Sequence, residues 1–226
     1  MSNLDDAGIL TVYIDGPERN FLNPGVMRGL LAEIKAADAN PEVKAILLTG
    51  KGDAFCGGLD LAAIRAGGDP VEFAACLAEL LKEFPRLRKP VAAAVNGDAV
   101  ASGGSIVAAV DYAVSLDSAK IGSYEVSVGV WPMVAQVPLI HRLGARAAME
   151  NVGSGNPLTA ERSFEIGLVN AVTDSANLIS MTKSWLIDAT RAGAAAHGRV
   201  SYYELAAMSY DDALDAALEK FAAQFR

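Results

Sequence analysis

Short apolar runs alternate with amphipathic stretches along most of the chain. The run Ile9–Ile14 (ILTVYI) is rich in β-branched residues and ends at Asp15-Gly16-Pro17, which predicts a strand followed by a turn. Apolar residues recur at helical spacing after Asn23-Pro24, a pair that suits the start of a helix. Further strands are predicted at Val43–Thr49, Val91–Val95, Ala113–Leu116 and Ala119–Gly122. Further helices are predicted at about Leu59–Ile64, Pro70–Phe84 and Val100–Val110.

This alternation of strands and helices is typical of a layered α/β fold with right-handed crossovers. After Pro132 helical stretches dominate, with Gly167–Val172 as a candidate last strand. We find no internal repeat and no linker, and 226 residues suffice for one domain with a good-sized core. The sequence therefore predicts a core of residues 1–175 and a helical C-terminal region of residues 176–226 in the same domain.

Composition narrows the class of protein. Hydrophobic residues make up 52% and charged residues 20%, as in globular proteins, and the net charge of −8 argues against a nucleic-acid partner. Cys56 and Cys76 lack the spacing of a metal site or a CxxC motif, so we expect reduced thiols and no metal. The start MSNLDDAGIL lacks a signal pattern, and no apolar run reaches the roughly 18 residues of a membrane span. We therefore expect a soluble, cytoplasmic protein that does not contact membranes.

Several kinds of catalytic site are disfavoured by missing motifs. The sequence contains no GxSxG nucleophile elbow, no P-loop and no GxGxxG dinucleotide motif. Its two histidines, His141 and His197, lie in an apparent helix and after a flexible Ala/Gly stretch. We expect both histidines to have structural or solvated roles.

Two glycine-containing loops remain as candidates, each after a buried strand and before a helix. The first reads AFCGGLDL over residues 54–61, and the second reads NGDAVASGGS over residues 96–105. Helix starts present free N–H groups, and glycine lets a ligand approach the backbone, so two such ends aimed at one point would bind an oxyanion. On spacing alone, the two loops could equally be ordinary Gly-rich connections.

Five segments in order resemble the crotonase (enoyl-CoA hydratase/isomerase) family. RNFLN resembles its early CoA-lining segment, and AFCGGLDL and NGDAVASGGSIVAAVDYAV resemble its two oxyanion segments. IGSYEVSVGVWP resembles the third, in which a Glu precedes a Gly and a Pro, and LGARAAMENVGSGNPLTAERSFEIGLVNAV resembles the stretch that follows. The matches run from about Ile9 to Val172. The resemblance implies a crotonase-like α/β fold, a ββα superhelix with a helical C-terminal region that supports trimers or hexamers.

The resemblance also implies roles for individual residues. The oxyanion donors would be the backbone N–H groups of Leu59 and Ser102, where the family usually has glycine at the second position. Glu125 would be the catalytic carboxylate, while Ser105 occupies the place of the second glutamate of the hydratases. The CoA and acyl groups would meet Asn20, Phe21, Leu22, Ala54, Gly57, Gly58, Asp60, Leu61, Gly103, Ser105 and Trp131. We expect Asp60 to cap the following helix rather than to touch substrate.

These assignments favour one reaction over its alternatives. A single carboxylate suits the 3-enoyl to 2-enoyl-CoA isomerases, in which one group shuttles a proton between two carbons of an enolate; no cofactor besides the substrate's CoA is implied. Hydration normally uses paired carboxylates to hold water and deliver a proton, and Ser105 is a poor proton donor. A slow hydratase, a decarboxylase and a non-catalytic CoA-binding protein are alternatives. So is a serine hydrolase that uses Ser102 or Ser105 with His141 as its base.

Overall fold

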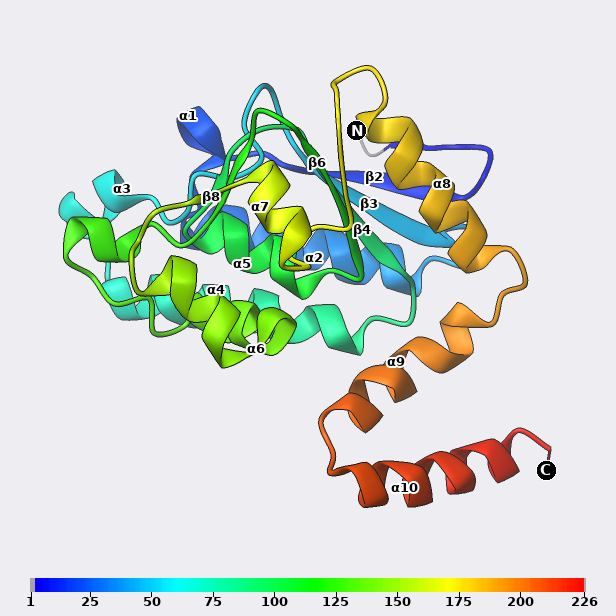
Figure 1. Ribbon diagram of the computed structural model, residues 1–226. Coiled ribbons are helices and arrows are strands. Elements are labelled where there is room, and N and C mark those ends of the chain that lie inside the picture. The colour runs from blue at the N-terminus through cyan, green and yellow to red at the C-terminus, as the bar shows by residue number, and fades with distance from the viewer. Residues whose placement is uncertain (1–2, 226) are drawn as a thin grey trace.

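A six-stranded sheet forms the centre of the computed structural model, which describes residues 3–225 (Figure 1). Its order is β1-β2-β3-β4-β6-β9, and every neighbouring pair is parallel except β1 with β2. The strands are β1 (Asn3–Leu4), β2 (Ile9–Ile14), β3 (Ala45–Gly50), β4 (Val91–Val95), β6 (Tyr112–Leu116) and β9 (Ala171–Thr173). All residues of β3 and β4 are buried, as expected of central parallel strands covered on both faces.

Helices cover both faces of this sheet. Residues that alternate along β2, β3 and β4 divide between two apolar cores, because successive side chains of a strand point to opposite faces. The larger core is shared with α2 (Pro24–Ala39), α4 (Pro70–Glu83), α5 (Ser102–Ala109) and α6 (Gln136–Val152). The smaller core lies under α8 (Leu178–Thr190), where Trp185 stacks on Tyr112 with ring centroids 4.7 Å apart. The first helix of the predicted C-terminal region is thus built into the core.

A second sheet of the described chain has three short strands. It has the order β5-β7-β8, with β5 (Ala99–Val100) parallel to β7 (Lys120–Gly122) and β8 (Leu158–Thr159) antiparallel to it. The short helices are α1 (Pro17–Asn20), α3 (Leu61–Arg65), α7 (Ala160–Glu165), η1 (Phe84–Arg86) and η2 (Glu125–Val128).

The predicted elements are present with shifted ends. The last strand of the main sheet occupies Ala171–Thr173 rather than 167–172, and the helix predicted from Val100 begins at Ser102 because Ala99 and Val100 pair with β7. The strand β8 was not predicted from the sequence.

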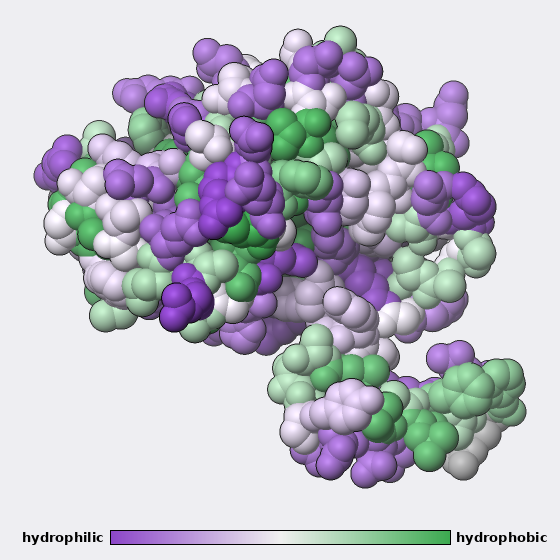
Figure 2. All heavy atoms as spheres, in the orientation of Figure 1, coloured by the Kyte–Doolittle hydropathy of each residue, from purple (hydrophilic) through white to green (hydrophobic). Residues whose placement is uncertain are grey.

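The end of the chain extends away from the body (Figure 1). Here α9 (Ala195–Ala206) is followed by α10 (Tyr210–Ala223), which packs against α9. Leu214, Leu218 and Phe221 of α10 are more than half exposed, and Figure 2 shows hydrophobic side chains gathered on this projection. An amphipathic helix with its apolar side in water is a surface that lacks a partner in the single chain.

A buried ion pair ties α9 to the body. Arg199 donates to both carboxylate oxygens of Asp111, at 2.7 and 2.8 Å, and also to the carbonyl of Leu87. Asp111 further accepts from Val91 N–H and from the Tyr203 hydroxyl. Burial, followed by the nearby Asp111 carboxylate, raises the pKa of Tyr203 to about 12, so its hydroxyl stays protonated and donates. A single, fully paired cluster therefore fixes the place of α9.

Candidate active site

Two asparagine side chains shape the first loop, which follows β3. The amide of Asn20 is buried and donates to the carbonyls of Lys51 and Ala54, at 2.9 and 2.7 Å. Asn96, at the end of β4, accepts from Gly50 N–H at 2.9 Å and donates back to the Gly50 carbonyl. Asn20 is one of the residues predicted to line the CoA site; its side-chain amide is buried and bound to the loop backbone, so this side chain supports the loop.

Backbone hydrogen bonds join the first loop to the second. The N–H groups of Phe55 and Cys56 donate to the carbonyl of Asp98, and Val100 N–H donates to the carbonyl of Cys56. At Gly103, an added Cβ would collide with the Cys56 carbonyl, which explains the need for glycine there. The sequence alone left open whether the loops were separate connections, and the structure brings them together.

The N–H groups of Leu59 and Ser102 are unengaged and lie near one another. Within residues 3–225 neither donates a hydrogen bond, although Gly58 and Asp60 on either side of Leu59 bond to Leu22 at 2.8 and 2.9 Å. Gly58 has a φ of +95°, and a Cβ placed on it would come within 3.6 Å of Ser102 N. Two free donors close together, one of them at the start of a helix, form a site suited to an oxyanion.

Ala101 holds the second donor in a strained position. It precedes α5 with φ 53° and ψ −122°, a conformation that side-chain-bearing residues rarely adopt. Its own N–H donates to the Gly122 carbonyl at 2.8 Å, which secures the turn. Strain of this kind costs on the order of 1–3 kcal/mol and is concentrated at functional sites.

The third segment brings Glu125 to the same end of the small sheet. Because β7 runs parallel to β5, the residues after Gly122 leave the sheet beside those after Val100. A Cβ on Gly104 of α5 would lie 2.6 Å from the Gly122 Cα, so the helix packs directly on this strand. Glu125 is partly buried at the start of η2, and its carboxylate accepts from Ser123 Oγ at 2.7 Å.

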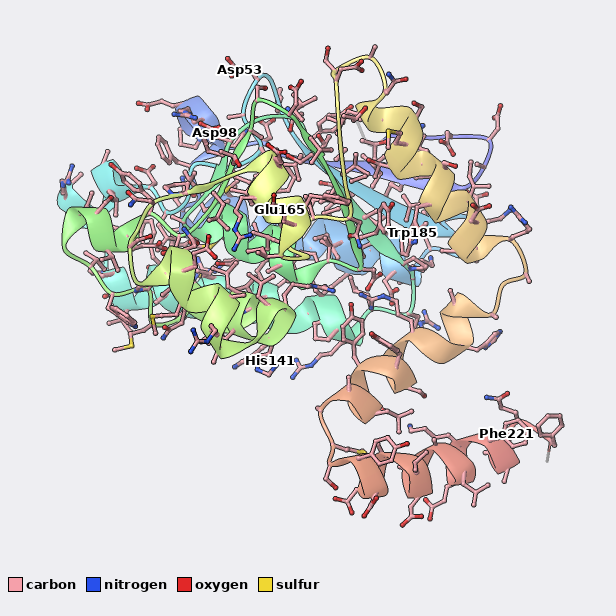
Figure 3. The ribbon with its side chains drawn as sticks, viewed as in Figure 1. Asp53, Asp98, His141, Glu165, Trp185 and Phe221 are labelled. Carbon is pink, nitrogen blue, oxygen red and sulfur yellow. The ribbon has the colours of Figure 1, made fainter. Side chains whose placement is uncertain are left out.

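Ser105 occupies the position at which the resemblance places the second glutamate of the hydratases. Its hydroxyl is not available to a substrate. It is fully buried, and its hydroxyl donates to the Ala135 carbonyl at 2.6 Å. His141, the candidate base for Ser102 or Ser105, is an exposed residue of α6, and Figure 3 shows it on the lower side of the body, well below Asp98 of the second loop. No hydrogen bond joins His141 to either serine in the described part of the chain. The geometry gives no support to the serine hydrolase.

Cys56 of the first loop is not a nucleophile in this environment. Its thiol is completely buried, and burial raises its pKa to about 12. The protonated thiol packs in the core between the two loops.

The remaining predicted residues divide between loop and surface. Leu22 and Ala54 are buried. The Phe21 ring packs against Gly57, where an added Cβ would lie 2.7 Å from the nearest ring carbon. Asp60 caps α3 by accepting from Ala63 N–H at 2.9 Å, as predicted. Leu61 and Trp131 are 46% and 44% exposed, so both are available to an apolar ligand.

Two hollows of the surface are lined by residues other than the two amide donors and Glu125. The larger, of about 720 Å³, lies at Gly144, Arg146 and Arg162. The other, of about 410 Å³, is lined by residues of both loops, among them Ala54 and Asp98, and by Arg19 and Leu116. The two amides and Glu125 line neither, so we assign the site from its donors and its carboxylate.

Among residues 3–225, no helix is both long and apolar enough to span a membrane.

Known proteins resemble this chain over most of its length. The family model described as enoyl-CoA hydratase/isomerase matches residues 5–219. A putative enoyl-CoA hydratase of Thermus thermophilus is 30% identical over 190 residues, which are 81% of this chain and 75% of the relative. Enoyl-CoA hydratase domain-containing protein 3 of Xenopus laevis is 30% identical over 212 residues, 91% of this chain and 72% of the relative.

Solved structures of other proteins share the fold. The crystal structure of enoyl-CoA hydratase from Mycobacterium smegmatis matches with a TM-score of 0.92 at 26% identity, covering 99% of this chain and 90% of that chain. A family protein from Silicibacter pomeroyi matches with a TM-score of 0.90 at 22% identity, covering 100% and 99%. These matches confirm the predicted crotonase-like α/β fold with its helical C-terminal region. The chain therefore belongs to the enoyl-CoA hydratase/isomerase family and is an acyl-CoA enzyme of the crotonase type.

Proposed function

We propose that this enzyme is a 3-enoyl to 2-enoyl-CoA isomerase in which Glu125 is the only catalytic carboxylate. The observation that carries the proposal is the environment of the acidic residues in the two loops and the third segment. Asp60 caps α3, and Asp98 pairs with Arg19 at 2.6 Å and accepts from Lys120 N–H. Glu125 is partly exposed, and it follows β7, which runs parallel to β5, the strand that leads to Ser102.

One carboxylate is sufficient for a proton shift between two carbons. Glu125 removes a proton from the carbon between the thioester carbonyl and the double bond of a 3-enoyl-CoA. The charge moves to the thioester oxygen, which the N–H groups of Leu59 and Ser102 stabilise, each donor being worth roughly 3–4 kcal/mol by deletion. Glu125 then returns the proton to the far carbon of the former double bond, which leaves a 2-enoyl-CoA. No proton is gained or lost overall.

Hydration is the second candidate, since relatives such as crotonyl-CoA hydratase of Syntrophomonas wolfei, 29% identical over 180 residues, carry that name. Addition of water needs one group to hold the water and another to deliver a proton. The hydroxyl of Ser105 is bonded to Ala135 and completely buried, so it supports neither task. This favours the isomerase.

Purified protein incubated with a panel of 2-enoyl- and 3-enoyl-CoAs tests the proposal. We expect 3-enoyl-CoA to be converted to 2-enoyl-CoA without formation of 3-hydroxyacyl-CoA, as identified by mass spectrometry and chromatography. A 3-hydroxyacyl product from 2-enoyl-CoA would establish the hydratase instead. Saturable binding of acyl-CoA in calorimetry with no conversion of any substrate would leave a CoA-binding protein.

We also propose that the chain forms a homotrimer or a hexamer. The exposed apolar residues of α10, among them Leu218 at 68% and Phe221 at 58%, need a partner surface. Light scattering is expected to give three or six times the chain mass of 23.5 kDa. Replacing Leu218 and Phe221 with Glu should lower that mass, whereas a monomeric wild type would contradict the proposal.

A further inference from the structure

Glu125 is held by one of its two carboxylate oxygens. Ser123 Oγ donates to Oε2 at 2.7 Å, and Tyr124 N–H donates to the same oxygen at 2.9 Å. No other hydrogen bond to this carboxylate occurs among residues 3–225, so Oε1 has none. Two donors on Oε2 restrict rotation of the carboxylate and leave Oε1 as the oxygen that can exchange a proton.

Ser123 is in turn fixed by a residue distant in sequence. Its N–H donates to Asn151 Oδ1, and its carbonyl accepts from Asn151 Nδ2 at 3.0 Å, so one amide side chain clamps the whole residue. Asn151 also donates to the Asn156 carbonyl at 2.8 Å. Ser123 and Asn151 are buried, with exposed fractions of 1% and 2%. At Gly122, with φ +119°, a Cβ would collide with the Asn151 amide. The clamp therefore depends on glycine at 122.

Resting on the proposed function, we propose that Ser123 is a positioning residue that aims the proton-shuttling carboxylate of Glu125. A hydrogen bond from a hydroxyl to a carboxylate is short and strong, and here it comes from a residue that cannot move. The same base must reach two carbons of one substrate in succession, so loss of its orientation affects turnover more than substrate binding.

Steady-state kinetics of Ser123→Ala, Ser123→Thr and Ser127→Ala test this assignment. Ser127 is the matched control, because its hydroxyl lies in η2 and donates at 2.7 Å to the Tyr124 carbonyl instead of to the carboxylate. For Ser123→Ala we expect kcat to fall roughly 10-fold or more, as loss of a hydrogen bond to a charged group implies, with KM changed less than about twofold. Ser123→Thr should restore most of kcat, and Ser127→Ala should match the wild type.

The outcomes separate this inference from the proposed function. If Glu125→Gln is inactive while Ser123→Ala keeps full kcat, the positioning role is overturned and the isomerase stands. If the wild type isomerises no enoyl-CoA, the isomerase fails, and the crystal structure of Ser123→Ala decides the positioning role by itself. A Glu125 carboxylate that leaves the Tyr124 N–H supports the role, and one that stays in place overturns it.

Discussion

Replacement of Glu125 with Gln is expected to reduce isomerisation roughly 100-fold or more, the usual contribution of a general base. Glutamine keeps the size of the side chain and can still accept from Ser123 Oγ, but it cannot take up a proton at neutral pH. Binding of an acyl-CoA should change little, because the amides of Leu59 and Ser102 are untouched. Turnover of 3-enoyl-CoA and calorimetric titration with a saturated acyl-CoA measure the two quantities separately.

Two control variants accompany this measurement. Glu165→Gln removes an exposed carboxylate of α7 that pairs with Arg162 and should leave turnover unchanged. Ser105→Ala removes the hydrogen bond to Ala135 and should affect isomerisation only mildly. Undiminished isomerisation by Glu125→Gln would contradict the role of Glu125 as the base. If Glu125→Gln stays active while Ser105→Ala loses activity, Ser105 has a catalytic role instead.

Replacement of Arg199 with Met is expected to lower the free energy of unfolding by roughly 3 kcal/mol, at the lower end of the range for breaking a buried ion pair. The Arg199 and Asp111 side chains are only 6% and 12% exposed, so the substitution leaves a buried carboxylate with fewer donors. Val91 N–H and the Tyr203 hydroxyl still donate to Asp111, which places the loss at the lower end. Urea denaturation at a single protein concentration gives the value.

The exposed pair Lys220–Glu204 supplies the control for Arg199. It joins α10 to α9 at 2.7 Å with side chains 37% and 49% exposed. Lys220→Met should therefore change the free energy of unfolding by less than about 1 kcal/mol. Equal stability of Arg199→Met and the wild type would show that α9 is held by its other contacts.

Local signals predicted much of the fold. The strand at Ile9–Ile14 and the strand at Val91–Val95 have the predicted bounds, because both are apolar runs that end at turn residues. The strand β8 has two residues in a polar stretch and exists only through its pairing with β7, so no local pattern marks it. The start of α5 moved to Ser102 for a similar reason, since Ala99 and Val100 pair with residues 22 positions away.

The candidate site was predictable where it depends on the backbone of a single loop. The predicted amides of Leu59 and Ser102 are free and close together, because glycine and a helix start are visible in each loop. The support that the Asn20 amide gives to the loop at Ala54 was not predicted, since the sequence position of Asn20 does not show that its amide reaches Ala54. The clamp on Ser123 joins residues 28 positions apart, and the ion pair of Arg199 with Asp111 joins residues 88 positions apart. At such separations a single sequence carries no signal that two residues pair.

Under the proposed self-association, the state of the projecting helix α10 depends on protein concentration. Its main contacts within the described part of the chain are with α9, and its large apolar side chains are exposed in the single chain. Under the proposed self-association, part of the free energy that orders α10 comes from neighbouring subunits and obeys mass action. Each tenfold dilution then lowers the free energy by which association stabilises α10 by about 1.4 kcal/mol. As the protein is diluted, α10 should therefore be the first segment to unfold or to be cleaved by a protease.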